Sequence, residues 1–303
     1  MSNSVTPNLI DGFIQDTRTS FKKESFSGHL KNDLFRALEK SMLEGQVESA
    51  CHWGAEIHCS GWADQLWEKL LIFMSRHIHL KNPTLPQYIL SKFIQHYKIS
   101  LQYQHQQLPL RNHSSSRKIM AHVITIMTLS KKGSMNLNRK IPLHEFNTQF
   151  INSRFEGSHH SLANTFFSPH DPMEIHAVIH ELAYQLRQKK TSSALYWIHW
   201  IWQLDKVRQK QKVPMVCARR SYKMVDKKYQ SDIVWLLWEA VFHSQFPIQC
   251  NAQLQALFKL YQLDFTIGKK GSRFPILLHA IYYLTEDIKW DIPIVRETSL
   301  LSQ

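Results

Sequence analysis

The chain has 303 residues, of which 43% are hydrophobic and 12% aromatic, and it contains only 9 glycines and 11 prolines. This composition suits two domains with buried cores, and it excludes long low-complexity segments rich in glycine and proline. The 37 lysines and arginines outnumber the 24 aspartates and glutamates, which gives a formal charge of +13 and favours a polyanionic partner, either nucleic acid or an acidic membrane or protein surface.

Apolar residues in the first half of the chain recur at helical spacing. Three sets step by three or four positions: Leu34, Leu38 and Met42; Ala50, Trp53 and Ile57; and Leu66, Leu70, Met74 and Ile78. Each set places its apolar side chains on one face of a helix. Two prolines in "HLKNPTLPQYI" separate one helix from the next, and "SSRKIMAHVITIMTLSKKG" has the serines and lysines that begin and end a further helix. Sustained period-two alternation is missing from the sequence, so a sheet is not favoured.

The second half of the chain repeats this pattern. The three sets recur 144, 144 and 168 positions later: Val178, Leu182 and Leu186; Ala194, Trp197 and Ile201; and Val234, Trp238, Phe242 and Phe246. The segment "AHVITIMT", residues 121–128, then matches "LHAIYYLT", residues 278–285. Repeated patterns in one order indicate a repeated unit, so the sequence predicts a duplication. The alternative is that any helical sequence aligns with itself when gaps are allowed.

The second copy contains a strongly basic insert. Trp53 and Trp67 are 14 residues apart, whereas their counterparts Trp197 and Trp235 are 38 apart, so the second copy has 24 extra residues. The insert holds one acid and nine candidate nucleic-acid-binding residues: Lys206, Arg208, Lys210, Lys212, Arg219, Arg220, Lys223, Lys227 and Lys228. Two interleaved tyrosines, at positions 222 and 229, suit base stacking beside phosphate contacts. An ordinary solvated loop, or a loop that binds an acidic protein surface, has the same composition.

These patterns predict an all-α protein with two tandem helical domains joined by a linker. The predicted parts are an N-terminal flexible arm (1–27), domain 1 (28–136), a linker (137–172), domain 2 (173–290) with the basic insert (206–230), and a C-terminal tail (291–303). The linker mixes polar runs with aromatic residues, and we expect it to pack onto a neighbour through Phe146, Phe150, Phe166 and Phe167.

Four cysteines, at positions 51, 59, 217 and 250, lack CxxC spacing, which argues against a zinc ribbon or a disulfide scaffold. Free thiols in a reducing compartment are the expected state. No stretch of about 18 uncharged apolar residues occurs, and the N-terminus has no apolar segment of signal-peptide type. We therefore expect an intracellular protein, cytoplasmic or nuclear, without a membrane partner.

Motifs for catalysis or metal binding are weak. His176 and His180 lie four residues apart with Glu181 beside them, but the order is not HExxH, and 18 histidines make such pairs common. No GxSxG motif or paired-carboxylate pattern occurs. The sequence therefore predicts no catalytic residue, metal, cofactor or small-molecule substrate, so we do not expect an enzyme.

A second cluster of polar residues suggests a ligand site, but the second copy does not share these residues. Cys51, His52, Glu56 and His58 crowd together in "ESACHWGAEIH", but the second copy has Leu195, Tyr196, Trp200 and Trp202 at these positions. The apolar types that both copies share indicate a core helix. The three neighbouring tryptophans at 197, 200 and 202 cannot all face one core, so we expect Trp200 or Trp202 to face a partner.

Residues 32–136 resemble a known family. The matching features are Lys40-Ser41 before Gly45, the helix with Ala50 and Trp53, Asn82-Pro83 after a helix, and the "AHVITIMTLSKK" helix. Together they are similar to the C-terminal helical region of RarA/MgsA-type AAA+ ATPases, a group that includes the Werner-helicase-interacting ATPase. The resemblance implies a fold like the collar domain of clamp loaders, which associates with itself and works at replication forks.

Two departures limit what the resemblance implies. No GxxxxGK[ST] loop occurs, and "GKKGS" at Gly268–Ser272 has the wrong spacing, so the resemblance does not extend to ATP hydrolysis. Arg76-His77 replaces the acidic pair that is usual after the third helix. The sequence thus favours a non-enzymatic nucleic-acid-binding or scaffold subunit in DNA replication, repair or genome maintenance. The alternative is a structural or assembly protein of a virion or other large complex, using collar-type self-association with protein partners.

Overall fold

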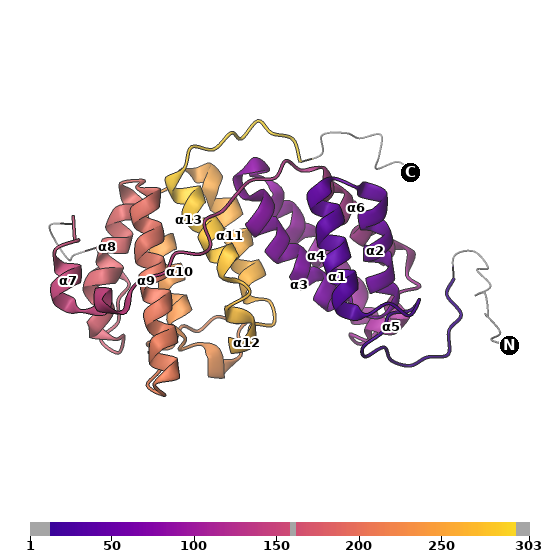
Figure 1. Ribbon diagram of the computed structural model, residues 1–303, viewed down its shortest axis with the longest axis horizontal. Coiled ribbons are helices and arrows are strands. Elements are labelled where there is room, and N and C mark those ends of the chain that lie inside the picture. The colour runs from indigo at the N-terminus through magenta and orange to yellow at the C-terminus, as the bar shows by residue number, and fades with distance from the viewer. Residues whose placement is uncertain (1–12, 158–161, 295–303) are drawn as a thin grey trace. The chain divides into compact units, whose positions relative to one another are not determined.

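The computed structural model describes residues 13–157 and 162–294 (Figure 1). Among these residues the regular structure is helical, and β pairing is limited to two isolated bridges, which confirms the all-α prediction. The chain divides into two compact units. Unit 1 comprises residues 1–133 and 291–303, and unit 2 comprises residues 134–290.

Unit 1 is built from helices whose buried faces match the apolar spacing of the sequence. Its helices are α1 (Lys31–Glu44), α2 (Val47–Cys59), α3 (Ala63–Phe73), α4 (Leu85–Gln102), α5 (Gln107–Leu110) and α6 (Ser114–Leu129). A π-helical turn (Met74–Ile78) and a 3-10 turn (His79–Lys81) continue α3. Helix α1 ends at Gly45, whose φ of 76° lies in the left-handed region that glycine adopts without strain. The predicted helix faces form the core, because α1, α2 and α6 pack against one another.

Residues 13–30, which form no helix, contact the C-terminal half of α2; we call this segment arm 1. The Glu56 carboxylate of α2 accepts hydrogen bonds from Ser25 Oγ (2.5 Å), Ser27 N (2.6 Å) and Ser27 Oγ (2.9 Å). Trp62 Nε1 donates to the carbonyl of Phe21 (3.1 Å). We expected residues 1–27 to form a flexible arm, whereas residues 13–27 make specific contacts; residues 1–12 lie outside the described part of the chain.

Unit 2 presents its long helices in the same order as unit 1. Its helices are α7 (Thr148–Asn152), α8 (His176–Arg187), α9 (Thr191–Lys210), α10 (Ile233–Phe242), α11 (Ile248–Gln262), α12 (Ile267–Lys270) and α13 (Phe274–Thr285). Its 3-10 turns are Leu143–Phe146, Ala163–Thr165, Met173–Ile175 and Lys227–Tyr229. As in the trio α1, α2 and α6, helices α8, α9 and α13 pack against one another. Thr128 and Thr285, which the sequence alignment pairs, both bond back to the carbonyl four residues earlier. These parallels support the duplication, which stays a prediction.

A second segment, residues 134–147, crosses α9 and ends in the 3-10 turn Leu143–Phe146; we call it arm 2 (Figure 1). Glu145 accepts a hydrogen bond from the Tyr196 hydroxyl (2.5 Å), and its carbonyl accepts one from Trp200 Nε1 (2.9 Å). Trp200 and Trp202 are 2% and 3% exposed, because arm 2 covers one side of α9 and Phe274 stacks on Trp202 at 4.2 Å. The prediction that Trp200 or Trp202 faces a partner is therefore wrong.

The predicted linker and tail both contact the helical units. Residues 137–172 group with unit 2, and three of the four expected phenylalanines pack on its helices: Phe146 on Trp200, Phe166 on His243 and Phe167 on His176. Phe150 packs instead on His144 within the segment. Residues 291–294 return to unit 1, where Asn82 Nδ2 donates to the carbonyl of Ile294 (3.2 Å).

Candidate nucleic-acid interface

The basic insert, residues 206–230, begins as helix and continues as a closed loop. Helix α9 has 20 residues against 13 in α2, so its last turns carry Lys206, Arg208 and Lys210. The chain then returns toward α10, and two backbone hydrogen bonds close the loop: Cys217 N to the Ser231 carbonyl and Arg220 N to the Gln230 carbonyl, each 2.9 Å. Residues 221–229 therefore form the tip.

Arg220 fixes the middle of the insert to the body of unit 2. Its side chain is 7% exposed and binds both carboxylate oxygens of Asp171 as well as Glu239 (2.8 Å). Burial would raise the pKa of Asp171, but hydrogen bonds from Arg220, Ser168 N and Ala218 N hold it below its ordinary value. A charge-assisted bidentate pair of this kind is a structural contact. The side chain of Arg220 is therefore buried and bound to two carboxylates, whereas the side chain of the adjacent Arg219 is exposed.

Lys270 joins the two ends of the insert. Its ammonium lies 2.6 Å from Asp205, just before the insert, and 2.7 Å from Asp232, just after it. All three side chains are less than 10% exposed. Asp232 also caps α10 by accepting a hydrogen bond from Val234 N (2.9 Å). Burial raises the pKa of Asp205, and the attraction of Lys270 opposes this. The ion triad therefore closes the base of the loop.

The two tyrosines of the insert pack toward the core of unit 2. Tyr222 contacts Trp235 and Phe258 at ring distances of 5.3 and 5.1 Å. Tyr229 packs on Phe265 at 6.1 Å, and its carbonyl accepts a hydrogen bond from Trp235 Nε1 (2.6 Å). Their rings hold the tip in place, so the geometry favours contact with phosphates over stacking with bases.

The remaining cations are exposed. Seven of the nine candidate residues have exposed side chains: Lys206, Lys210, Lys212, Arg219, Lys223, Lys227 and Lys228. Lys228 lies 3.5 Å from Asp226, and half-buried Arg208 pairs with Glu174. The other six exposed cations form no ion pair with the described residues. Sequence spacing could not separate these roles, because Asp171, Glu239 and Lys270 lie outside the insert.

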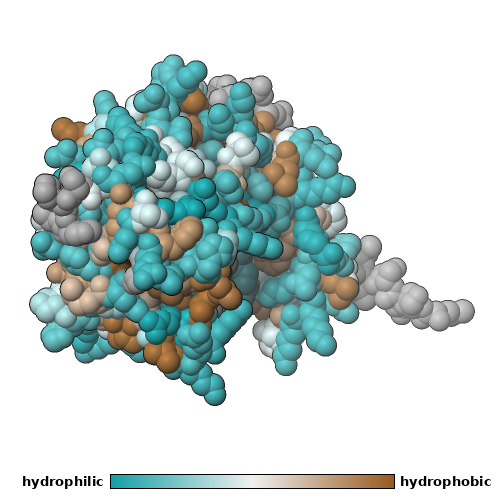
Figure 2. Space-filling model, turned by 60° about the vertical axis from the view of Figure 1, so that its left-hand side comes forward, coloured by the Kyte–Doolittle hydropathy of each residue, from teal (hydrophilic) through white to brown (hydrophobic). Residues whose placement is uncertain are grey.

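One face of unit 2 is mainly polar (Figure 2). Figure 2 brings forward the side that carries α7 and α8 in Figure 1, and hydrophilic residues cover most of that face, with hydrophobic residues in small groups. Among the helices of residues 13–157 and 162–294, none combines the length and the hydrophobicity that a membrane span requires. Exposed Val213, Val216 and Met224 lie among the cations of the insert.

The histidine pair at α8 has structural contacts. His180 is 1% exposed and accepts a hydrogen bond from Leu162 N (3.2 Å), while His176 bonds to Asn164 (3.0 Å). Glu181 accepts hydrogen bonds from the backbone N–H groups of residues 156 and 157. In residues 13–157 and 162–294, no three His, Cys, Asp or Glu side chains are grouped to hold a metal ion.

No family model, curated protein or solved structure matches the chain. The candidate interface is therefore described by its own residues, which are exposed cations on a segment that buried ion pairs fix to the helices.

Proposed function

We propose that the chain is a non-enzymatic nucleic-acid-binding subunit that contacts the phosphate backbone through the insert of unit 2. The observation that carries this proposal is the contrast between the buried ion pairs that fix the insert and the seven exposed cations that it presents. A fixed segment loses less conformational entropy on binding than a free loop does. Its cations gain affinity by releasing the counterions that surround nucleic acid.

The biological setting is a separate part of the proposal. Replication, repair or genome maintenance, in the cytoplasm or nucleus, follows from the resemblance of residues 32–136 to clamp-loader collar domains. That resemblance rests on packing motifs around Ala50 and Trp53. It concerns unit 1, whereas the cations belong to unit 2, so the setting and the binding are tested separately.

Binding is tested by reversing the charge of four exposed cations of the insert while Arg220, which fixes the insert, is kept. Arg219, Lys223, Lys227 and Lys228 are replaced together by glutamate, with Arg220 unchanged. Titrations with single- and double-stranded DNA and with RNA at two salt concentrations measure affinity and salt dependence. We expect weaker binding and a flatter plot of log K against log salt, by about 0.7–0.9 for each phosphate that the protein no longer neutralises.

The control carries the same charge change on unit 1. Lys22, Lys23, Lys98 and Lys118 are all exposed, and replacing them with glutamate alters the net charge equally. Unchanged affinity in the insert variant, or an equal loss in the control, would show that the insert is not the interface. Circular dichroism on both variants excludes unfolding as the cause of a loss.

One observation favours assembly as the second candidate function. Ile94, Tyr97 and Leu101 lie three and four residues apart on α4, and they are 43%, 45% and 50% exposed. An exposed apolar stripe at this spacing suits a helix–helix contact with a partner. Light scattering separates the candidates: a stable higher oligomer without nucleic-acid affinity at physiological salt supports the assembly function.

A further inference from the structure

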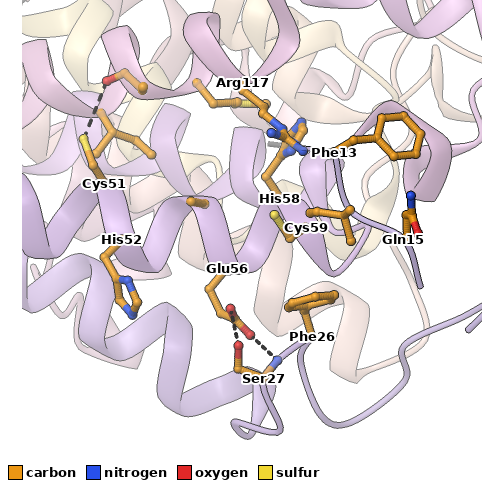
Figure 3. A pocket seen from close by; sticks show the side chains of 15 residues that line it. Phe13, Gln15, Phe26, Ser27, Cys51, His52, Glu56, His58, Cys59 and Arg117 are labelled. Atoms are coloured by element: carbon orange, nitrogen blue, oxygen red, sulfur yellow. Dashed lines mark hydrogen bonds between the residues drawn. The ribbon is translucent and has the colours of Figure 1, made fainter. Parts of the chain in front are cut away.

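A cavity of about 470 Å³ lies in unit 1 between α2, α6 and arm 1 (Figure 3). Its size falls in the usual range for binding pockets, roughly 300–1,000 Å³. Ala55 and Cys59 of α2 and Ala121 of α6 line it. In Figure 3, Arg117 reaches in from α6, while Phe13 and Phe26 of arm 1 stand on the opposite side from Cys51 and His52.

Small side chains cause this cavity. Ala55 and Ala121 are exposed, although they lie on the walls between two packed helices. At the alignment offsets of 144 and 157, their counterparts in unit 2 are His199 and Leu278, which are 3% and 0% exposed. At the aligned positions, unit 2 therefore has larger side chains, and these are buried.

Several positions that line the cavity in unit 1 carry aromatic side chains at the aligned positions of unit 2. The counterpart of Arg117 is Phe274, which stacks on Trp202 at 4.2 Å and meets His199 edge-on at 5.0 Å. Trp200, the counterpart of Glu56, packs against Phe146 of arm 2 at 5.3 Å. In unit 2, aromatic rings therefore fit between α9, α13 and arm 2.

The two charged side chains of the cavity wall and one nitrogen of His58 already have hydrogen-bond partners. Glu56 accepts three hydrogen bonds from arm 1. Arg117 donates to the Arg111 carbonyl (2.5 Å) and to Asn112 Oδ1 (3.1 Å). His58 is buried and bonds to Ser116 (2.9 Å). An occupant therefore gains from burial of its apolar surface more than from an ion pair.

We propose that this cavity is a docking site for an aromatic side chain of a protein partner. Unit 1 has Ala55, Glu56 and Arg117 where the aligned positions of unit 2 carry aromatic rings, and a partner's tryptophan, tyrosine or phenylalanine supplies such a ring. Large aromatic anchors in desolvated pockets contribute much of the affinity of protein interfaces. The docking site is independent of the basic insert, so the failure of one proposal leaves the other standing.

The first experiment uses the full chain and two small probes. N-acetyl-tryptophanamide represents an aromatic side chain in a peptide, and N-acetyl-leucinamide represents an aliphatic one. Isothermal titration or NMR measures both affinities. We expect the tryptophan probe to bind about tenfold more tightly, which corresponds to about 1.4 kcal/mol. Equal affinities, or no binding of the tryptophan probe, would overturn the proposal.

The second experiment closes the cavity with the side chains of unit 2. Ala121→Leu and, separately, Ala55→His each introduce the counterpart residue, and each should weaken binding of the tryptophan probe by about tenfold or more. Ala252→Leu on the exposed surface of α11 is the matched control and should leave the affinity for the probe unchanged, since this variant keeps the cavity. Binding that survives in both filled variants contradicts the assignment.

A third measurement does not depend on a cavity-filling variant. Cys51 and Cys59 line the cavity and are partly exposed, whereas Cys217 and Cys250 are buried. The tryptophan probe should therefore slow alkylation of Cys51 and Cys59 by iodoacetamide. If it slows alkylation only after residues 1–12 are deleted, the chain itself occupies the cavity, and the proposal is wrong.

Discussion

At the scale of single residues, neighbouring cations in the insert have opposite roles. Arg219 is exposed and bonds to Gln230 (2.7 Å), whereas Arg220 is buried between two carboxylates. The guanidinium of Arg220 satisfies Asp171, which is 3% exposed. Removing one partner of a buried ion pair leaves an uncompensated charge in a medium of low polarity.

Arg220→Met is therefore expected to lower the free energy of unfolding by about 3–5 kcal/mol. Urea unfolding followed by circular dichroism measures the change. Arg219→Met is the matched control, and its effect should stay within about 0.5 kcal/mol because it is a surface substitution. Equal effects of the two substitutions would contradict the anchoring role of Arg220.

The sequence could not distinguish these two arginines. They are adjacent, both lie in a run of cations, and the residues that separate their roles are Asp171 and Glu239, which are 49 and 19 positions from Arg220. Only the folded chain brings these carboxylates to one side chain. For Ala50, Ile57 and Leu66, by contrast, helical spacing was enough to predict burial.

At the scale of elements, local spacing predicted most helices but not the start of the insert. Lysine, arginine and glutamine are good helix formers, so "DKVRQK" continues α9 as far as Lys210. The rest of the insert is shaped by contacts with distant residues. Lys270 of α12 is the clearest case, since it binds Asp205 and Asp232 together.

Lys270→Met should loosen the whole insert. Asp205 and Asp232 would then be buried near each other without a cation, and the carboxylates would repel. Hydrogen–deuterium exchange should accelerate in residues 211–231, with a loss of stability of about 3–5 kcal/mol. Exposed Lys259→Met on α11 serves as the control. Unchanged exchange in the insert would exclude Lys270 as the residue that closes it.

At the scale of the whole molecule, buried histidines in both units predict a pH dependence. Burial lowers the pKa of His58 to about 3, and that of His96 and His199 to about 4. In the unfolded chain these groups take up protons near pH 6.5, whereas in the folded chain they stay neutral. The unfolded state therefore binds more protons, so stability decreases as the pH falls below about 6.5.

The expected slope is up to about 1.4 kcal/mol per pH unit for each histidine. Urea unfolding at intervals between about pH 7 and 5 measures it, a window above the ordinary pKa values of aspartate and glutamate. His199→Gln should reduce the slope by the share of one histidine, and exposed His52→Gln should leave it unchanged. A stability that is constant across this window contradicts the prediction.

The arms mark the limit of sequence-based prediction for the whole chain. Residues 13–27 and 137–147 have no regular spacing, so they were expected to form a flexible arm and part of a linker. Their structure depends on single contacts with α2 and α9 such as those of Glu56 and Glu145. The same contacts explain why Trp200 is buried.

In these contacts, the helix and the arm exchange the roles of hydrogen-bond donor and acceptor between the two units. In unit 1 the carboxylate belongs to the helix, as Glu56, and arm 1 supplies hydroxyls; in unit 2 the carboxylate belongs to arm 2, as Glu145, and the helix supplies Tyr196 and Trp200. If arm 2 lay on α2, the Glu145 carbonyl would face the Glu56 carboxylate where it now accepts from Trp200 Nε1, so two acceptors would meet without a donor. If arm 1 lay on α9, its serines would find no carboxylate at position 200. The polar contacts therefore favour binding of each arm to its own helix. They disfavour an exchange of arms between the two similar units, within one chain or between chains.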